Sequence, residues 1–330
     1  MSILWCGGED VDFTAPSIIT VTNGGFRTGF ARCSISCSTR NAKSLPFASG
    51  PVTSAWLTWY SFFNANDTNL RFIGLVNSAT ANSGIWFGPG TQSNKAAIFK
   101  YDGTTLTLLA QEGGTSLGPI IATIGLTKFD LQIINFGSSS IVNLFIGGAL
   151  VISYSGSTAI SGISNLDCVG LGAGSGVNNT AMSEIIVADE STLGFQGLVT
   201  MAPNGNGASQ QWSNPGYTNV NPTTVNDANS TYTNATGQDE QLTTNNMPTG
   251  IFQIKAVKVV ARAAATSGAT ATGLKLGFNN TNNSVAAEGS AHTLGSGFSP
   301  VEEYFATDPT NGGAAFGANL NGYQIELRSA

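Results

Sequence analysis

The sequence has few charged residues, and they are not grouped by sign. Only 10% of the 330 residues are charged, the formal net charge is −6, and lysine and arginine nowhere form a cluster. A protein that binds nucleic acid neutralises phosphates with a concentrated basic face. We therefore expect no nucleic-acid partner.

Long apolar runs are also missing. No run reaches the roughly 18 apolar residues that a membrane-spanning helix needs, so we expect no membrane partner. The first residues, MSILWCGGEDVDF, have acidic side chains where a signal peptide has a basic region. This predicts a mature chain that starts at Met1 and is made in a cytoplasm.

Apolar residues nowhere recur with the period of a helix. Short runs rich in valine, isoleucine and phenylalanine recur at intervals of roughly 8–12 residues instead, separated by turns of glycine, asparagine or aspartate. The clearest example is 128–155, where Gly147 and Gly148 separate two apolar runs. Glycine accepts the positive φ of a two-residue hairpin turn. These patterns predict an all-β fold of stacked antiparallel sheets.

The four cysteines show no spacing typical of a metal or redox site. In ARCSISC, Cys33, Ile35 and Cys37 are expected on one face of a strand. Cys33 and Cys37 would lie about 13 Å apart along that strand, which is too far for a disulfide. We predict reduced core cysteines, with a Cys6–Cys168 bridge as the alternative.

The composition changes after Ala181–Glu190, which we interpret as the closing strand of a first domain. Residues 203–250 are crowded with asparagine, threonine, serine and glycine and have few apolar anchors, whereas strand-like runs return from Ile251 onward. We predict two domains, 1–194 and 195–330. The polar segment 203–250 is expected to lie across the second domain or to wrap a neighbour, since so few apolar residues cannot hold it alone.

The run VNLFIGGALVISYSG resembles the central strands of concanavalin A-like (laminin-G-like) jelly rolls. The resemblance implies a concanavalin A-like jelly-roll sandwich, followed by a second, smaller antiparallel β-sandwich. It implies little about function, because such folds include lectins, hydrolases and purely structural modules.

A second resemblance involves SEIIVADESTLG, APNGNGASQQW and VNDANSTYTNATG. In this order they resemble a two-domain pattern of virion proteins of tailed bacteriophages. The resemblance implies a non-enzymatic structural component of the virion, in the tail, the baseplate, a fibre or the head surface. Such a protein would form a homo-oligomer and dock onto other virion proteins, and no cofactor is implied.

The most aromatic run, AWLTWYSFF, spans Ala55–Phe63. Alternation along a strand places Trp56 and Trp59 on opposite faces, which is typical of core positions on at least one face. As an alternative, Trp56, Trp59 and Trp86 line a platform for a host surface glycan. The alternative function is then a receptor-contact module.

The densest group of carboxylates is Glu9, Asp10 and Asp12. On a strand, Asp10 and Asp12 would share a face about 7 Å apart. They are then either solvent-facing or part of a Ca²⁺ site, which needs six to eight oxygen ligands.

Catalytic patterns are not found. A retaining glycosidase needs two carboxyl groups about 5–5.5 Å apart, and the E-x-D-x-x-E strand of jelly-roll glucanases does not occur. His292 is the one histidine, and no serine around it lies in a G-x-S-x-G turn. The glycine-rich Gly170–Gly176 is not followed by the helix of a dinucleotide site. We predict that the protein is not an enzyme and has no cofactor.

Overall fold

The chain forms two compact units, Met1–Leu198 and Val199–Ala330, in a computed structural model. Each unit is described by itself. The residues that the structure describes are 2–15, 18–23, 25–27, 30–37, 42–62, 71–90, 95–113, 127–172, 181–194, 197–220, 224–250, 253–279, 287–317 and 320–330.

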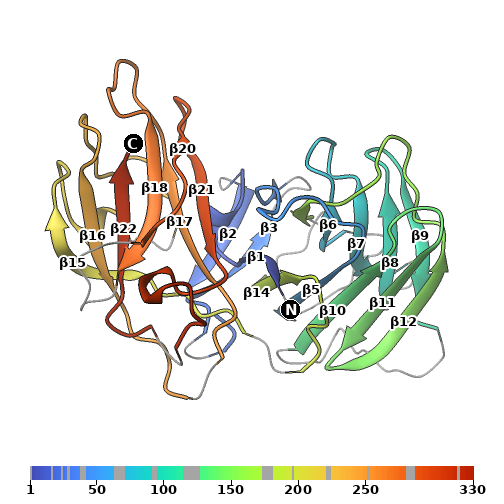
Figure 1. Cartoon of the computed structure of the whole chain (residues 1–330). Coiled ribbons are helices and arrows are strands. Elements are labelled where there is room, and N and C mark those ends of the chain that lie inside the picture. The colour runs from blue at the N-terminus through green and yellow to red at the C-terminus, as the bar shows by residue number, and fades with distance from the viewer. Residues whose placement is uncertain are drawn as a thin grey trace. The chain divides into compact units, whose positions relative to one another are not determined.

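The first unit contains a large antiparallel sheet (Figure 1). One of its strands, β1, lies outside the linear strand order and pairs with β14. In spatial order its strands are β12 (Ala149–Gly156), β11 (Ser140–Ile146), β10 (Thr127–Ile134), β5 (Ala55–Phe62), β14 (Ala181–Ala188), β3 (Cys33–Cys37) and β2 (Ile19–Asn23), with β1 at Ile3–Gly7.

A second antiparallel sheet completes the first unit. Its strands in spatial order are β4 (Ala42–Lys43), β13 (Cys168–Leu171), β6 (Ile73–Val76), β7 (Gly84–Pro89), β8 (Ala96–Tyr101) and β9 (Leu106–Gln111).

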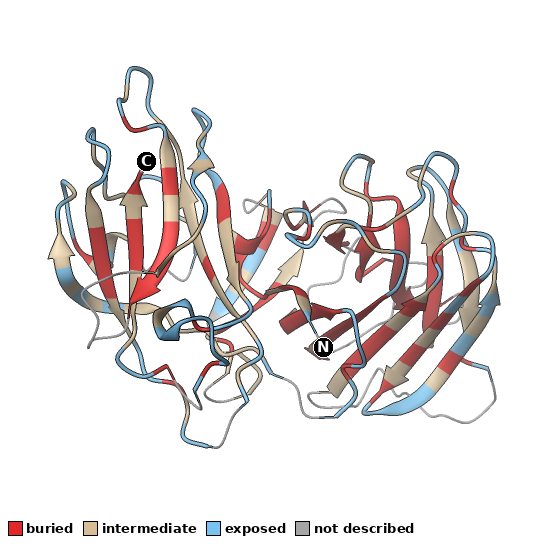
Figure 2. Ribbon diagram, viewed as in Figure 1, coloured by how far each residue is buried: buried red, intermediate tan, exposed pale blue. Residues whose placement is uncertain are grey.

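Aromatic side chains join the two sheets. Trp59 of β5 stacks on Phe129 of β10 with ring centroids 5.3 Å apart, and both rings lie 5.3 Å from Phe87 of β7. Leu131 and Leu144 point to the same side and are fully buried. Figure 2 shows the resulting alternation of buried and more exposed residues along β11. The first unit is therefore a sandwich with one core between two sheets.

The second unit is built around another antiparallel sheet and a separate pair of strands, β17 (Val257–Ala263) and β21 (Ser299–Phe305). Phe278 of the sheet packs edge-on against Phe305 of the pair, with centroids 4.8 Å apart. The sheet comprises β15 (Pro203–Gln210), β16 (Asp239–Thr244), β22 (Gln324–Ser329), β18 (Gly273–Asn279) and β19 (Ala287–Glu288), and β20 (His292–Thr293) also pairs with β18.

The predicted fold class is confirmed: the chain is all-β, with a jelly-roll sandwich followed by a second, smaller antiparallel β-sandwich. Among the described residues, no helix has the length and apolar character needed to cross a membrane.

Several predicted strands are shorter in the structure. The first strand ends at Gly7, and the chain then makes a 3₁₀ turn, η1 (Asp10–Asp12). Within ARCSISC the strand β3 begins only at Cys33, and β13 begins at Cys168. Ala31 and Leu166 precede these two strands and are buried, although neither belongs to a named strand. Hydrophobic pattern alone therefore overestimates strand length.

The polar segment 203–250 contributes β15 and β16 to the sheet of the second unit, so these parts are strands of that sheet and do not lie across it. Leu242 of β16 is buried in that unit's core. β16 is held in the sheet by backbone hydrogen bonds to β22, since its few apolar side chains cannot hold it alone.

All four cysteines are free thiols, so the alternative Cys6–Cys168 bridge is not formed. Cys33 and Cys168 are fully buried, and burial raises the pKa of each thiol to about 12. A thiol that stays protonated at physiological pH is a poor nucleophile and metal ligand.

We predict that L144A destabilises the first unit by about 2–5 kcal/mol, because it leaves a cavity beside the inter-sheet core. I141A on the same strand is the matched control. Ile141 points to the other face and is 41% exposed, so this change should cost less than about 1 kcal/mol. Denaturant unfolding of both variants measures the difference, and equal losses would contradict the assigned faces of β11.

Candidate functional site

The three tryptophans of the predicted glycan platform face different parts of the first unit. Trp56 lies on the outer face of the large sheet, is 9% exposed, and stacks on Phe145 with centroids 5.5 Å apart. Trp59 is buried between the sheets, whereas Trp86 is buried on the other face of the second sheet and donates from Nε1 to the Asn82 carbonyl oxygen at 3.1 Å. The structure does not bring the three indoles together.

The carboxylates of the predicted Ca²⁺ site are buried in the η1 turn and do not share a strand face. Asp10 and Asp12 are each 3% exposed, so the solvent-facing alternative is wrong. Oδ2 of Asp12 accepts hydrogen bonds from the backbone N–H groups of Gly8 (2.8 Å) and Glu9 (2.9 Å). The Asp12 carboxylate therefore caps a turn.

Glu9 forms a two-pronged ion pair with Arg32, at 2.7 and 2.6 Å. Burial raises the pKa of Glu9, and the Arg32 guanidinium opposes that rise. A carboxylate buried in this way is retained by its partner, since an unpaired buried charge is costly. The group of acidic residues near the N-terminus thus has a structural role in closing the end of β1.

Glu184 is a second buried carboxylate with a structural role. It is fully buried, has a φ of +54° at a bulge in β14, and binds the Arg27 guanidinium, whose Nε donates at 2.8 Å. Phe30 and Tyr60 lie against Arg27, with ring centroids 3.9 and 4.0 Å from its Cζ. No local sequence pattern predicts this ion pair, because Arg27 and Glu184 are far apart along the chain.

One outward row of side chains crosses the large sheet from β5 to β12. Trp56 is opposite Gln132, Gln132 is opposite Asn143, and Asn143 is opposite Ser153. The Asn143 amide donates from Nδ2 to Oε1 of Gln132 at 2.8 Å. This row places two planar amides beside an aromatic ring.

The neighbouring row of outward side chains, Asp130, Phe145 and Leu150, is covered at its β10 end. Oδ1 of the buried Asp130 accepts from Thr192 Oγ1 at 2.7 Å and lies 2.9 Å from the Lys128 ammonium. Lys128 also donates to the Gly194 carbonyl oxygen at 3.1 Å. Residues 192–194 therefore cover the sheet over β10, while Leu150 at the β12 end of the row is 56% exposed.

We call the uncovered part of this sheet the open face. Its side chains lie on β10, β11 and β12 and are all half-buried or exposed. They are Gln132, Ile134, Ile141, Asn143, Phe145, Leu150, Ser153 and Ser155. The open face combines an aromatic ring, aliphatic groups, amides and hydroxyls, so it offers van der Waals contact and neutral hydrogen bonds.

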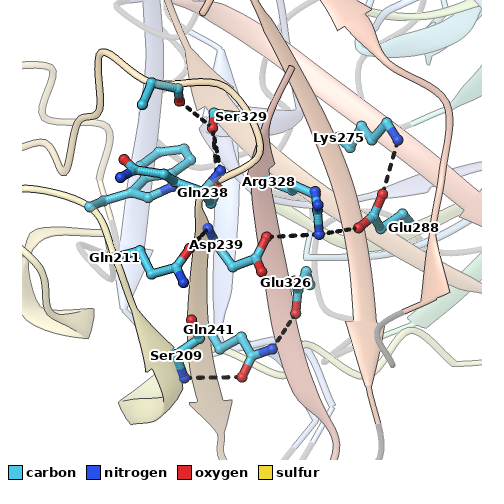
Figure 3. Close-up of polar contacts among 12 residues, drawn as sticks. Ser209, Gln211, Gln238, Asp239, Gln241, Lys275, Glu288, Glu326, Arg328 and Ser329 are labelled. Carbon is cyan, nitrogen blue, oxygen red and sulfur yellow. Dashed lines mark hydrogen bonds and ion pairs between the residues drawn. The ribbon is translucent and has the colours of Figure 1, made fainter. Parts of the chain in front are cut away.

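Three carboxylates meet on the sheet of the second unit (Figure 3). Asp239 of β16, Glu326 of β22 and Glu288 of β19 each place an oxygen within 4.8 Å of the others. Arg328 lies between two of them, with Nη1 3.3 Å from Asp239 and 3.1 Å from Glu288, and Lys275 is 3.0 Å from Glu288. Cross-strand register creates this cluster, and no local sequence pattern indicates it.

Glu326 is the most buried member of the cluster, at 1% exposed. Burial raises the pKa of Glu326 to about 7, although Gln241 donates to its Oε2 at 2.6 Å and favours the ionised form. Asp239 and Glu288 raise it further. The cluster is thus a salt-bridged ladder in which Arg328 and Lys275 are the cations and the buried Glu326 has a raised pKa.

His292 lies beside a carboxylate of the second unit. Its Nε2 lies 2.9 Å from Oε2 of Glu303, which also accepts from the Ser290 N–H at 3.2 Å. The loop Gly170–Gly176 lies partly outside the described residues.

Comparison with known proteins finds no matching family model and no matching curated relative. Solved structures with partial similarity include carbohydrate-binding module CBM66 from Bacillus subtilis, with 13% identity, 52% of this chain and 94% of that chain covered, and a TM-score of 0.32. The cellulose induced protein Cip1 has 16% identity, coverage of 56% and 94%, and a TM-score of 0.36.

The binding domain of Paraclostridial Mosquitocidal Protein 1 is similar at 9% identity, with a TM-score of 0.36. The match covers 57% of this chain and only 44% of that chain. With TM-scores this low, these likenesses carry no argument about function, which has to rest on the side chains described above.

We predict that Glu326 makes stability fall as pH rises. The folded state holds a proton on Glu326 between its ordinary pKa of 4.5 and its folded value of about 7. Because the folded state then binds more protons than the unfolded state, raising pH through this window destabilises it. E326Q should therefore gain melting temperature relative to the parent at pH 8 and gain little at pH 5.

The exposed Glu190 provides the control for this pH series, and E190Q should leave the melting temperature unchanged at both pH 5 and pH 8. A difference between E326Q and the parent that is the same at pH 5 and pH 8 would show that Glu326 does not titrate in this window.

Proposed function

We propose that the first unit is a non-catalytic glycan-binding module that binds its ligand on the open face. The observation that carries the proposal is the adjacency of the half-buried Phe145 and the Gln132–Asn143 amide pair on the outer face of the large sheet. Oδ1 of Asn143 is buried, so the Asn143 amide offers N–H donors to a ligand. A sugar ring presents apolar C–H groups on its faces and hydroxyls around its rim. The open face matches both, with a ring for stacking and amides for the hydroxyls.

The packing of the open face suits a ligand-binding surface better than a catalytic one. The carboxylate nearest to it, Asp130, is buried under Thr192 and engaged by Lys128. General acid–base catalysis needs groups within hydrogen-bond reach of the substrate. The proposal therefore assigns binding to this surface and no chemical step.

We predict that F145L weakens glycan binding at least tenfold, about 1.4 kcal/mol. Leucine keeps most of the apolar volume but has no flat aromatic face for stacking. A glycan array identifies a ligand, and titration calorimetry measures the affinity. L108A is the control, because Leu108 is a half-buried residue of β9 in the other sheet.

F145L and L108A should keep the parent's cooperative melting, which separates lost binding from lost folding. Binding that survives F145L unchanged would contradict the open face as the site. An array without any bound glycan would contradict the proposed function.

A structural role in a phage particle is the second candidate function, and the position of β12 favours it. β12 is the edge strand of the large sheet, it has no charged residue, and its Leu150 is exposed. An edge strand without charges is a template for pairing with another chain. Such a surface suits self-association or docking onto other virion proteins.

This second candidate predicts that antibodies to the chain label purified phage particles in electron micrographs. Labelling confined to one part of the particle would identify the tail, baseplate, fibre or head surface. The particles come from a phage that encodes the chain. If they stay unlabelled while their denatured protein reacts with the antibody on a blot, the epitopes lie inside the particle. Virion protein that gives no reaction on the blot would contradict the role.

A further inference from the structure

The open face lies within a part of the chain that has no charged residue. From Leu131 to Leu166 the sequence contains no aspartate, glutamate, lysine or arginine, although charged residues make up 10% of the chain. This stretch includes all of β11 and β12 and the second half of β10, Leu131–Ile134. The hydrogen-bonding side chains that it exposes are amides and hydroxyls.

Among the described residues, Lys128 and Asp130 precede the charge-free stretch on β10 and are paired with each other. Lys128 binds Asp130 and the Gly194 carbonyl oxygen, and the Asp130 carboxylate is fully buried. Lys100 belongs to β8 of the other sheet and donates to the Ala159 carbonyl oxygen at 3.2 Å. The open face itself therefore has no cation with which to meet an anionic group.

An acidic sugar would bind this surface at a disadvantage. A carboxylate or sulfate that leaves water needs a lysine, an arginine or several N–H donors as compensation. The open face offers neutral amides, of which Gln132 and Asn143 already share one hydrogen bond. A neutral sugar loses no charge hydration and can use the same amides for its hydroxyls.

We infer that the open face selects neutral glycans and discriminates against uronic, sialylated and sulfated ones. The inference rests on the proposed function and specifies the ligand class of the same site. The preference for neutral glycans follows from the charge-free stretch and from the pairing of the bordering charges. Neither observation depends on whether Phe145 stacks on a sugar ring.

The test measures binding of the full chain to matched neutral and acidic oligosaccharides. Neutral probes are oligomers of glucose, mannose and arabinose, and acidic probes are oligogalacturonate, alginate oligomers and sialyllactose. We expect affinity for at least one neutral probe to exceed that for every acidic probe by tenfold or more. We also expect it to change less than twofold between 50 and 300 mM salt, because no ion pair is involved.

A charge-reversal pair at Ser153 sharpens the test, since this serine is exposed at the edge of the open face. S153K and S153E should weaken a neutral ligand to a similar degree, within about twofold of each other. An acidic ligand would bind S153K more tightly than S153E by more than tenfold at low salt. T107K and T107E on β9 of the other sheet control for overall charge.

The outcomes separate the inference from the proposed function. Preference for an acidic probe, or a large difference between S153K and S153E, would overturn the inference and leave glycan binding in place. No binding to either class would overturn both. A rise in mass with concentration that S153K and S153E abolish would assign the surface to a second copy of the chain and also overturn the inference.

Discussion

The contact of Trp59 and Phe129 with Phe87 is the interaction on which the first unit depends. It fixes which side of β5 and β10 faces the second sheet, and the strict alternation of a strand then fixes every other side chain of β10 and β11. With Leu131 and Leu144 directed inward, Gln132 and Asn143 must point outward. The composition of the open face is thus a consequence of how the core is packed.

The outer faces of the two sheets of the first unit differ in how far they are buried. On the second sheet, Trp86 and Phe99 form an additional apolar layer that is buried. On the large sheet, a short segment around Thr192 covers Asp130, and the strands beyond it keep amides, hydroxyls and apolar groups in contact with solvent. Burial of the charged pair beneath Thr192 and the neutral composition beside it together give the open face its chemical character.

Much of the strand layout could be predicted from the sequence, because local signals and tertiary structure agree there. The Gly147–Gly148 hairpin joins β11 and β12 as expected, with Ile146 opposite Ala149. By contrast, β15 and β16 could not be predicted, since their order comes from backbone pairing between polar segments. The 3₁₀ turn at Asp10 was also missed, because a capping carboxylate has the same local signature as a solvated one.

The candidate site could be predicted only in part. Period-two alternation placed Trp56 and Trp59 on opposite faces of a strand, but it could not show which of them faces the core or that Trp86 lies on another sheet. The pairing of Gln132 with Asn143 depends on the register of β10 against β11, and the Asp239–Glu288–Glu326 ladder depends on the register of strands distant in sequence. Register is set by the assembled core, which a single sequence does not display.

The most direct measurement of the central claim is an NMR titration of the full chain with a neutral oligosaccharide that it binds. The account predicts that backbone amide shifts change along β10, β11 and β12, with the largest changes around Asn143, Phe145 and Ser153. Shifts confined to β7, β8 and β9, or to the second unit, would place the ligand elsewhere and contradict the account.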